Sequence, residues 1–220
     1  MKKPLFNQKS PSLSVSEWVQ GEATSLEQLL GNVVLVEVFQ VNCPGCFLYS
    51  LPAAVALHQQ YSTQGLVVLG VATAFEDFNK NTLGNLKGLL EKGEVVGETL
   101  HTLQQQGRLT NGSLPYRIPF PVAMDRLTQR QGEASAEEIQ AFITEKLPDF
   151  KDYPTSQQQV VQQQVEQYFA ALIYHAETFD RFHLQGTPSH ILIDKQGKLR
   201  ACKFGAYTAL EAHILTLLNE

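Results

Sequence analysis

The chain has 220 residues, of which 43% are hydrophobic and 18% are charged, and its formal net charge is −5. These values predict an ordinary soluble protein of one domain with a sizeable core, and they give no reason to expect a nucleic acid or an anionic membrane as a partner. The three cysteines are too few, and odd in number, for a secreted scaffold built from disulfides.

The N-terminal residues carry no targeting signal that we can identify. The chain begins Met1-Lys2-Lys3, but residues 4–16 contain no continuous apolar stretch like that of a signal peptide or a membrane anchor. This pattern predicts a cytoplasmic protein without a membrane partner. Residues 11–22 predict an extended lead-in or edge hairpin, and residues 25–31 predict a brief helix that ends at Gly31.

Residues 33–57 combine a strand, a cysteine pair and a helix. Residues 33–39 are apolar and mostly β-branched apart from Glu37, which suits a strand buried on both faces. The motif Cys43-Pro44-Gly45-Cys46 follows, and apolar residues then recur at helical spacing. A thiol at the first turn of a helix lies near the positive end of the helix dipole, which favours the thiolate. Cys43 is therefore the candidate nucleophile.

The cysteines have plainer interpretations as well. Cys43 and Cys46 could form half of a zinc site, but such a site usually has four ligands and no second Cys or His pair lies at ligand spacing. Neither a metal nor a cofactor is therefore expected. Cys202 lies in an alternating stretch typical of a strand; a buried inert thiol is the favoured interpretation, and a resolving or regulatory role is the alternative.

The central part of the sequence predicts more of an α/β sheet. Residues 65–73 read as a second buried strand that completes a right-handed parallel βαβ unit with residues 33–39. The cysteines would then lie at the carboxyl edge of the sheet, where open α/β sheets bind ligands. Helices are expected over residues 83–92 and 95–106, and a third central strand over 120–125, with a turn starting at Asp125.

Some sixty residues separate Asp125 from Gly186, and we expect a mainly helical insertion at about 128–185 within a single domain spanning residues 1–220. Residues 135–146 begin with Ser and Glu in capping-box register and predict a helix, and residues 155–184 predict a longer one with glutamines on its outer face. The apolar side of the longer helix is expected to pack in the core. A dimer contact or a substrate-docking surface is the alternative, which leaves a homodimer open.

The C-terminal part supplies a second motif. The sequence Gly186-Thr187-Pro188-Ser189 leads into an apolar strand at 190–194, which is followed by a turn, a strand at 199–204 and a terminal helix at about 208–218. An isolated Thr-Pro is usually a plain loop. Its combination with the segment of strand, Cys-x-x-Cys and helix is a much stronger indication of a functional site than either motif alone.

These features together resemble the thioredoxin superfamily, with the redoxin branch of TlpA-like disulfide reductases and peroxiredoxin relatives as the nearest match. The resemblance spans roughly residues 18–218. Thioredoxins also have a buried acid before the first cysteine, at the position that Glu37 occupies here. It implies an α/β fold with a central mixed sheet flanked by helices and a helical insertion before the cis-proline loop. Pro188 should be cis and pack against the cysteines, and Pro44, Gly45, Thr187 and Pro188 should contact the substrate.

The resemblance implies catalysis of thiol–disulfide exchange, with an antioxidant role. Cys43 would attack a disulfide in a protein or a small thiol substrate, Cys46 would resolve the mixed disulfide, and a thiol reductant would restore the dithiol. Cys46 must lose its proton for this step. A buried carboxyl group can act as a base near neutral pH, and we assign that role to Glu37, directly or through a water.

Several positions depart from the family pattern. Asn42 stands where thioredoxins have a tryptophan, and Pro52 comes nine residues after Cys43, later than in typical TlpA-like proteins. A peroxiredoxin-like peroxidase is the first alternative, but Val36 and Gln40 hold the places of its proline and threonine, which argues against efficient peroxide chemistry. A non-catalytic thioredoxin-like binding protein is the second. Retention of both cysteines, the acid and Thr-Pro favours the enzyme.

Overall fold

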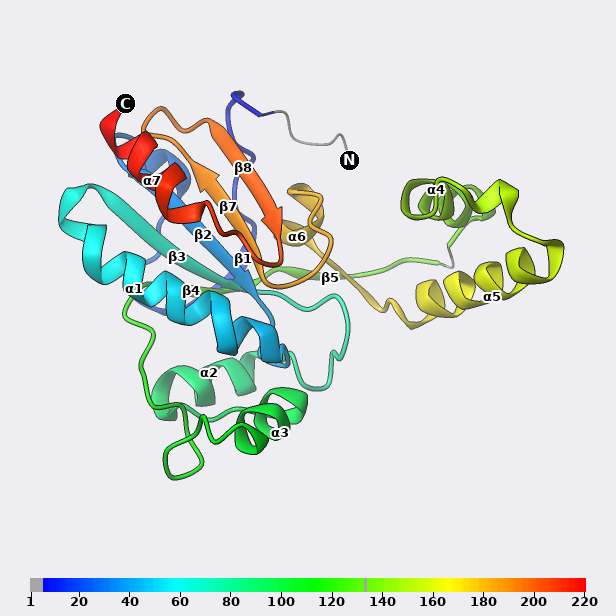
Figure 1. Cartoon of the computed structure of the whole chain (residues 1–220), viewed down its shortest axis with the longest axis horizontal. Coiled ribbons are helices and arrows are strands. Elements are labelled where there is room, and N and C mark those ends of the chain that lie inside the picture. Colours follow the sequence, from blue (N-terminus) through cyan, green and yellow to red (C-terminus); the bar gives the residue numbers. More distant parts are fainter. Residues whose placement is uncertain (1–5, 133) are drawn as a thin grey trace. The chain divides into compact units, whose positions relative to one another are not determined.

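The computed structural model describes residues 6–132 and 134–220, and a six-stranded sheet lies at its centre (Figure 1). In spatial order the strands are β1 (Val15–Gln20), β4 (Val122–Asp125), β3 (Leu66–Ala72), β2 (Val33–Phe39), β7 (Ser189–Ile193) and β8 (Leu199–Phe204). β2, β3 and β4 are parallel, whereas β1, β7 and β8 each run antiparallel to a neighbour. The predicted central mixed sheet is confirmed.

β2 lies in the interior of this sheet. It pairs with β3 on one edge and with β7 on the other, and all of its residues are buried. Alternate side chains of a strand face opposite sides. Leu35 and Phe39 belong to one core cluster, which also contains Cys43 and Cys46, and Val36 belongs to the cluster on the other face. Glu37 has the parity of Leu35 and Phe39, so it faces the side of the sheet that carries the cysteines.

Helices α1 (Leu51–Tyr61) and α7 (Leu210–Asn219) cover that side of the sheet (Figure 1). A single π-helical turn, Cys46–Ser50, precedes α1, and the N–H of Leu51 donates to the carbonyl of Cys46 across it. Pro52 has no N–H to give to the residue four positions earlier and its ring crowds that carbonyl, so a wider turn at this place accommodates it.

The remaining helices of this part of the chain are α2 (Leu83–Lys92), α3 (Gly97–Gln105) and α6 (Glu177–Arg181), with 3₁₀ turns at Leu26–Leu29 and Ser62–Gln64. The expected helices at 83–92, 95–106 and 208–218 are thus confirmed with shifts of a residue or two at their ends. No helix within residues 6–132 and 134–220 is long and apolar enough to cross a membrane.

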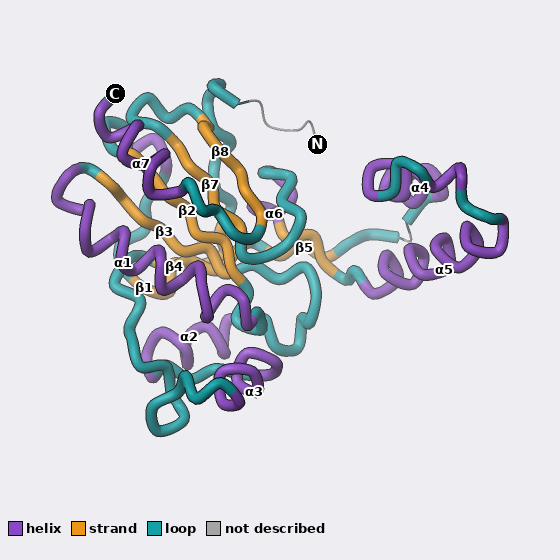
Figure 2. Tube along the Cα trace, in the orientation of Figure 1, coloured by secondary structure: helices purple, strands orange, loops and turns teal. Residues whose placement is uncertain are grey.

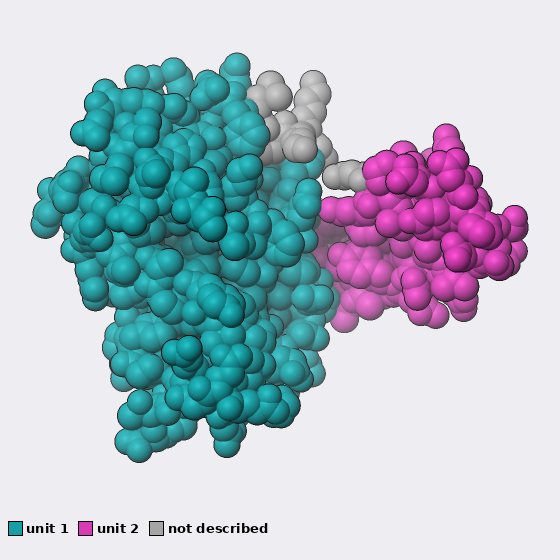
Figure 3. Space-filling model, viewed as in Figure 1, with its two compact units in different colours: residues 1–127, 176–220 teal, residues 128–175 magenta. Residues whose placement is uncertain are grey.

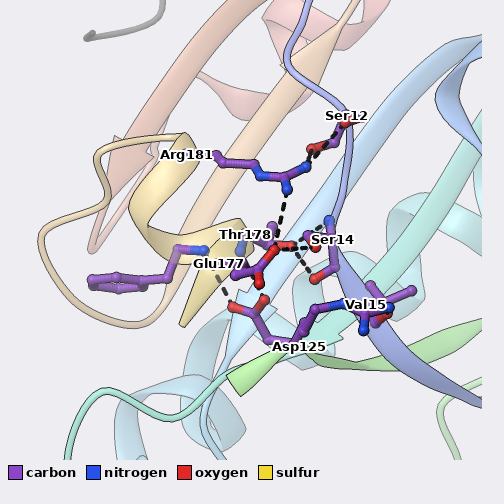
Figure 4. Close-up of polar contacts among 9 residues, drawn as sticks. Ser12, Ser14, Val15, Asp125, Glu177, Thr178 and Arg181 are labelled. Carbon is purple, nitrogen blue, oxygen red and sulfur yellow. Dashed lines mark hydrogen bonds and ion pairs between the residues drawn. The ribbon is translucent and has the colours of Figure 1, made fainter. Parts of the chain in front are cut away.

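A buried polar network fixes the end of β4 to the N-terminal segment and to α6 (Figure 4). The backbone of Ser14 both donates to and accepts from the hydroxyl of Thr178, at 2.9 and 2.8 Å. Asp125, which is fully buried, accepts from the N–H of Thr178 at 2.8 Å, and Glu177 accepts from the hydroxyl of Ser14 and from Arg181. Asp125 therefore fixes β4 to α6, and Thr178 of α6 fixes the N-terminal segment, which goes beyond the turn expected at Asp125.

The chain divides into two compact units, residues 1–127 with 176–220 and residues 128–175 (Figure 3). The smaller unit contains α4 (Ala136–Lys146), a 3₁₀ turn at Phe150–Asp152 and α5 (Thr155–Ala171) (Figure 2). Phe142 of α4 stacks on Tyr168 and meets Phe169 edge to face, with ring centroids 5.5 and 5.4 Å apart. No side chain of α5 is fully buried, so the expected core packing of this helix is wrong.

The helix predicted over residues 155–184 begins where expected, but its predicted end is wrong, because α5 runs from Thr155 to Ala171. The chain continues as the short strand β6 (Tyr174–Ala176), paired with β5 (Leu127–Gln129), and then as α6. The N–H of Arg130 donates to the carbonyl of Ile173 in the same ribbon. Residues 172–174 are bulky, branched or aromatic, a composition that favours strands once a pairing partner is present.

Candidate active site

The cysteine pair lies at the start of the helical segment after β2. Helical backbone begins at Pro44, directly after Cys43, and proline suits a first helical position because its missing N–H would have no intrahelical partner there. Cys43 and Cys46 form a disulfide with their Cα atoms 5.4 Å apart. Cys43 is 8% exposed and Cys46 is 0% exposed, so Cys43 is the sulfur that a substrate can approach.

The backbone around Cys43 can stabilise a thiolate. The N–H of Cys46 points at the sulfur of Cys43 from 3.3 Å, and it also contacts the carbonyl of Cys43. An N–H group at the start of a helix favours negative charge, both as a donor and through the helix dipole. In the reduced protein the same group would favour ionisation of the Cys43 thiol.

The Thr187-Pro188 loop meets the cysteine pair. The Thr187–Pro188 peptide bond is cis, and the carbonyl oxygen of Thr187 lies 3.6 Å from the sulfur of Cys43. A Cβ atom placed on Gly45 would lie 3.9 Å from Cδ of Pro188, so the two residues are neighbours. The carbonyl of Pro188 accepts from the N–H of Gly205, which attaches the loop to the end of β8. The predicted cis bond and its position beside the cysteines are confirmed.

Asn42 links the Cys-x-x-Cys loop to two other segments. Its side chain donates to Asp77 at 2.7 Å and accepts from the N–H of Glu98 at 2.7 Å, while its own N–H donates to Asn81 at 2.8 Å. The sequence marked Asn42 as a departure from thioredoxins. In the structure it is the residue that anchors the loop before Cys43.

Glu37 has a buried partner that the sequence did not reveal. Its Oε2 atom lies 2.7 Å from Nδ1 of His190, and the two residues are 0% and 4% exposed. They stand directly opposite each other on the antiparallel strands β2 and β7, so their side chains share one face of the sheet. The other ring nitrogen of His190, Nε2, lies 3.1 Å from the carbonyl oxygen of Gly205.

Two opposing effects act on the charge of His190. Burial lowers its pKa, but the hydrogen bond to Glu37, the charge of that carboxylate and the Gly205 carbonyl outweigh burial, and the pKa lies above its ordinary value. The ring of His190 therefore holds its second proton more tightly than a free histidine does.

A cavity of about 610 Å³ opens beside the disulfide, on the side of the cis-proline loop. Its lining is mostly apolar, and it includes Gly45, Tyr49, Pro188, His190 and Tyr207. His190 thus connects the buried carboxyl group of Glu37 with a space next to the redox centre.

Cys202 lies apart from this site. It stands opposite Ile191 on β7, and both belong to the cluster on the face of the sheet away from Cys43 and Cys46. Burial raises the pKa of the Cys202 thiol to about 12, so it is protonated at neutral pH. The geometry favours the inert thiol over a resolving role. Within residues 6–132 and 134–220, no three His, Cys, Asp or Glu side chains gather as metal ligands.

No protein-family model matches the chain, and no curated protein matches it significantly. Solved structures do match over almost its whole length. A thiol-disulfide isomerase from Corynebacterium glutamicum is 27% identical with a TM-score of 0.60, covering 97% of this chain and 98% of its own. A thioredoxin-like superfamily protein is 26% identical with a TM-score of 0.59, covering 96% and 97%. A thioredoxin-like protein in its oxidised form is 16% identical with a TM-score of 0.50, covering 99% and 95%.

Proposed function

We propose that this chain, which belongs to the thioredoxin-like superfamily, is a thiol–disulfide oxidoreductase that reduces disulfides in proteins. One observation carries the proposal. The Cys43–Cys46 disulfide lies at a helix start, and its more exposed sulfur is 3.6 Å from the carbonyl that precedes cis-Pro188. This arrangement presents one sulfur to a substrate and keeps the other buried for the second step.

In the proposed reaction the reduced enzyme donates two electrons. The Cys43 thiolate attacks a substrate sulfur, which forms a mixed disulfide and releases the first substrate thiolate. Cys46 then loses its proton and attacks the sulfur of Cys43. The mixed disulfide breaks, the second substrate thiolate leaves, and the enzyme ends as the Cys43–Cys46 disulfide.

Glu37 is proposed as the base for Cys46, directly or through a water. Its carboxyl group is buried on the same face of the sheet as Cys46. Pro44, Gly45, Thr187 and Pro188 are proposed to contact the substrate, whose extended backbone would pair with Thr187. Positions of these residues around Cys43 support that assignment.

A cytoplasmic thiol reductant is proposed to regenerate the dithiol. Reducing pools of the cytosol keep such pairs in the dithiol form, which would drive electrons from the enzyme to its substrates and give it an antioxidant role. A homodimer is also proposed, since Val160 and Tyr168 of α5 are 54% and 40% exposed. Sedimentation equilibrium of the full chain tests the dimer directly.

The test of the function uses insulin as a disulfide-bonded substrate and dithiothreitol as the reductant. Cys43→Ser should reduce the rate of insulin reduction to background, and Cys46→Ser should trap a mixed disulfide. Cys202→Ser is the matched control and should retain the wild-type rate. If Cys43→Ser keeps the activity, the dithiol mechanism is wrong; hydrogen peroxide consumption by the wild type would instead favour the peroxidase.

A further inference from the structure

The two oxygens of the Glu37 carboxyl group differ in their hydrogen bonding. Oε2 contacts Nδ1 of His190, whereas Oε1 is buried and has no hydrogen-bond partner within residues 6–132 and 134–220. Native proteins rarely leave a buried carboxyl oxygen without a donor, because its lost hydration is then uncompensated. An oxygen in this state is available to take a proton.

The Gly205 carbonyl determines where the protons of His190 lie. A backbone carbonyl only accepts hydrogen bonds, so the contact from Nε2 to Gly205 places a hydrogen on Nε2. A second proton on the ring must then lie on Nδ1, between the imidazole and Oε2 of Glu37. The pair shares this proton, and Oε2 is occupied by it.

We propose that His190 is a positioning residue for the resolving step, because it engages Oε2 of Glu37 and leaves Oε1 as the oxygen that receives the proton of Cys46. The inference rests on the role of Glu37 in the proposed function and adds to it the residue that orients that base. The hydrogen bond holds the carboxyl plane and occupies Oε2, so that Oε1 is the free acceptor.

The proton and electron transfers balance without a further reactant. The proton moves from the sulfur of Cys46 to Oε1 of Glu37, and the Cys46 thiolate attacks the sulfur of Cys43 in the mixed disulfide. The Cys43–Cys46 bond forms, the bond from Cys43 to the substrate breaks, and the electron pair leaves on the substrate thiolate. The dithiol is oxidised and the substrate disulfide is reduced.

Other titratable groups face this pair and enter its pH dependence. The ring centroid of Tyr207 lies 6.0 Å from that of His190, and the hydroxyl of Tyr207 is 2.6 Å from Nδ1 of His213. Lys203 stands opposite His190 on β8, and Glu211 of α7 and Tyr49 line the same cavity as His190. These groups are unchanged in the variants below, so differences between variants report on the pair.

The test separates attack by Cys43 from resolution by Cys46. The reduced protein, in a Cys202→Ser background, is mixed with one equivalent of an aromatic disulfide whose thiol product is coloured. The first coloured thiol reports attack by Cys43 and the second reports resolution, each followed by stopped flow from about pH 5 to about pH 9. Thermal unfolding of each variant monitors the fold.

His190→Leu should slow the second phase by roughly 10- to 100-fold, the value of a charged hydrogen bond, and should leave the first phase unchanged. Its pH–rate profile should shift relative to that of the wild type, because the imidazole of His190, whose pKa lies above its ordinary value, is removed. His190→Asn keeps a donor near the position of Nδ1 but carries no charge. It should recover part of the rate while its profile stays shifted.

Each outcome has one meaning. If Glu37→Gln slows the second phase but both His190 variants match the wild type in rate and pH profile, the proposal for His190 is wrong and the role of Glu37 stands. If Glu37→Gln also matches the wild type, the role of Glu37 as base fails instead. If the first phase slows as much as the second, His190 supports the whole site, and its positioning role is wrong. Should His190→Leu not fold, the comparison of His190→Asn with the wild type decides.

Discussion

At the scale of single residues, the two active-site sulfurs differ in exposure while the third thiol lies on the other face of the sheet. Cys43 is slightly exposed, Cys46 is fully buried, and the N–H of Cys46 points at the sulfur of Cys43. Cys202 is only partly buried, but burial raises the pKa of its thiol to about 12. Reactivity should therefore differ strongly among the three thiols.

This difference can be measured by alkylation. In the reduced protein, Cys43 should react with iodoacetamide well before Cys202 at about pH 7, because only the thiolate is nucleophilic. Mass spectrometry of peptides after timed quenching gives the rate at each site. Cys43→Ser is the control, in which the fast fraction should vanish. Faster labelling of Cys202 than of Cys43 would contradict the assigned environments.

The sequence alone predicted some residues of the candidate site and missed others. Glu37 and Cys43 were found because each stands inside a local pattern, a strand or a helix start. His190 was missed, although it is two residues beyond Pro188, because its partner lies across the sheet and depends on the register of β2 with β7. No local spacing in a single sequence gives that register.

At the scale of elements, Asp125 at the end of β4 accepts hydrogen bonds from Thr178 and Phe179 of α6, and Thr178 in turn bonds the backbone of Ser14 in the N-terminal segment (Figure 4). Burial raises the pKa of Asp125 to about 6, and the donors from Thr178, Thr73 and Phe179 only partly offset this effect. An unfolded aspartate titrates near about 3.9, so the native state binds more protons between about pH 4 and about pH 6. The free energy of unfolding contributed by this group therefore falls as pH rises through that window.

Asp125→Asn should flatten this pH dependence. In urea unfolding, the free energy of unfolding of the wild type should fall by roughly 2–3 kcal/mol between about pH 4 and about pH 7 because of this group, and that of the variant should fall by less. Asp149→Asn, which alters an exposed aspartate, is the control and should follow the wild type. His190 also has a raised pKa and contributes in the same direction, but equally in all three proteins. Parallel curves for wild type and Asp125→Asn would contradict the account.

The elements that were predicted correctly have strong local patterns. The strands at 33–39 and after Pro188 are mostly apolar runs, the helix after Cys46 has apolar residues at helical spacing, and turn residues stand at their ends. The helix expected over residues 155–184 shows the limit of this reasoning. Its helical spacing continues past Ala171, but pairing of β6 with β5 determines where the helix ends.

At the scale of the whole molecule, the strands of the central sheet and all the proposed site residues lie in one of the two compact units. The proposal of a single domain with an inserted helical segment makes a direct prediction. Replacing residues 131–172 by Asn-Gly would close β5 and β6 with a two-residue hairpin turn. The shortened protein should keep the Cys43–Cys46 disulfide and reduce insulin at a rate comparable to that of the full chain. A folded protein without this activity would show that residues 131–172 take part in catalysis or substrate binding.

Cys43 and Cys46 are proposed to cycle between dithiol and disulfide, with the enzyme acting as a reductant. The measurement that tests this cycle most directly is the equilibrium of the pair with glutathione in the Cys202→Ser protein, followed by thiol labelling. We predict a reduction potential near the thioredoxin value of about −270 mV, at which the enzyme reduces protein disulfides in a reducing compartment. A potential near about −120 mV would indicate an oxidant and contradict the proposed direction, and failure to form the disulfide would contradict the dithiol mechanism itself.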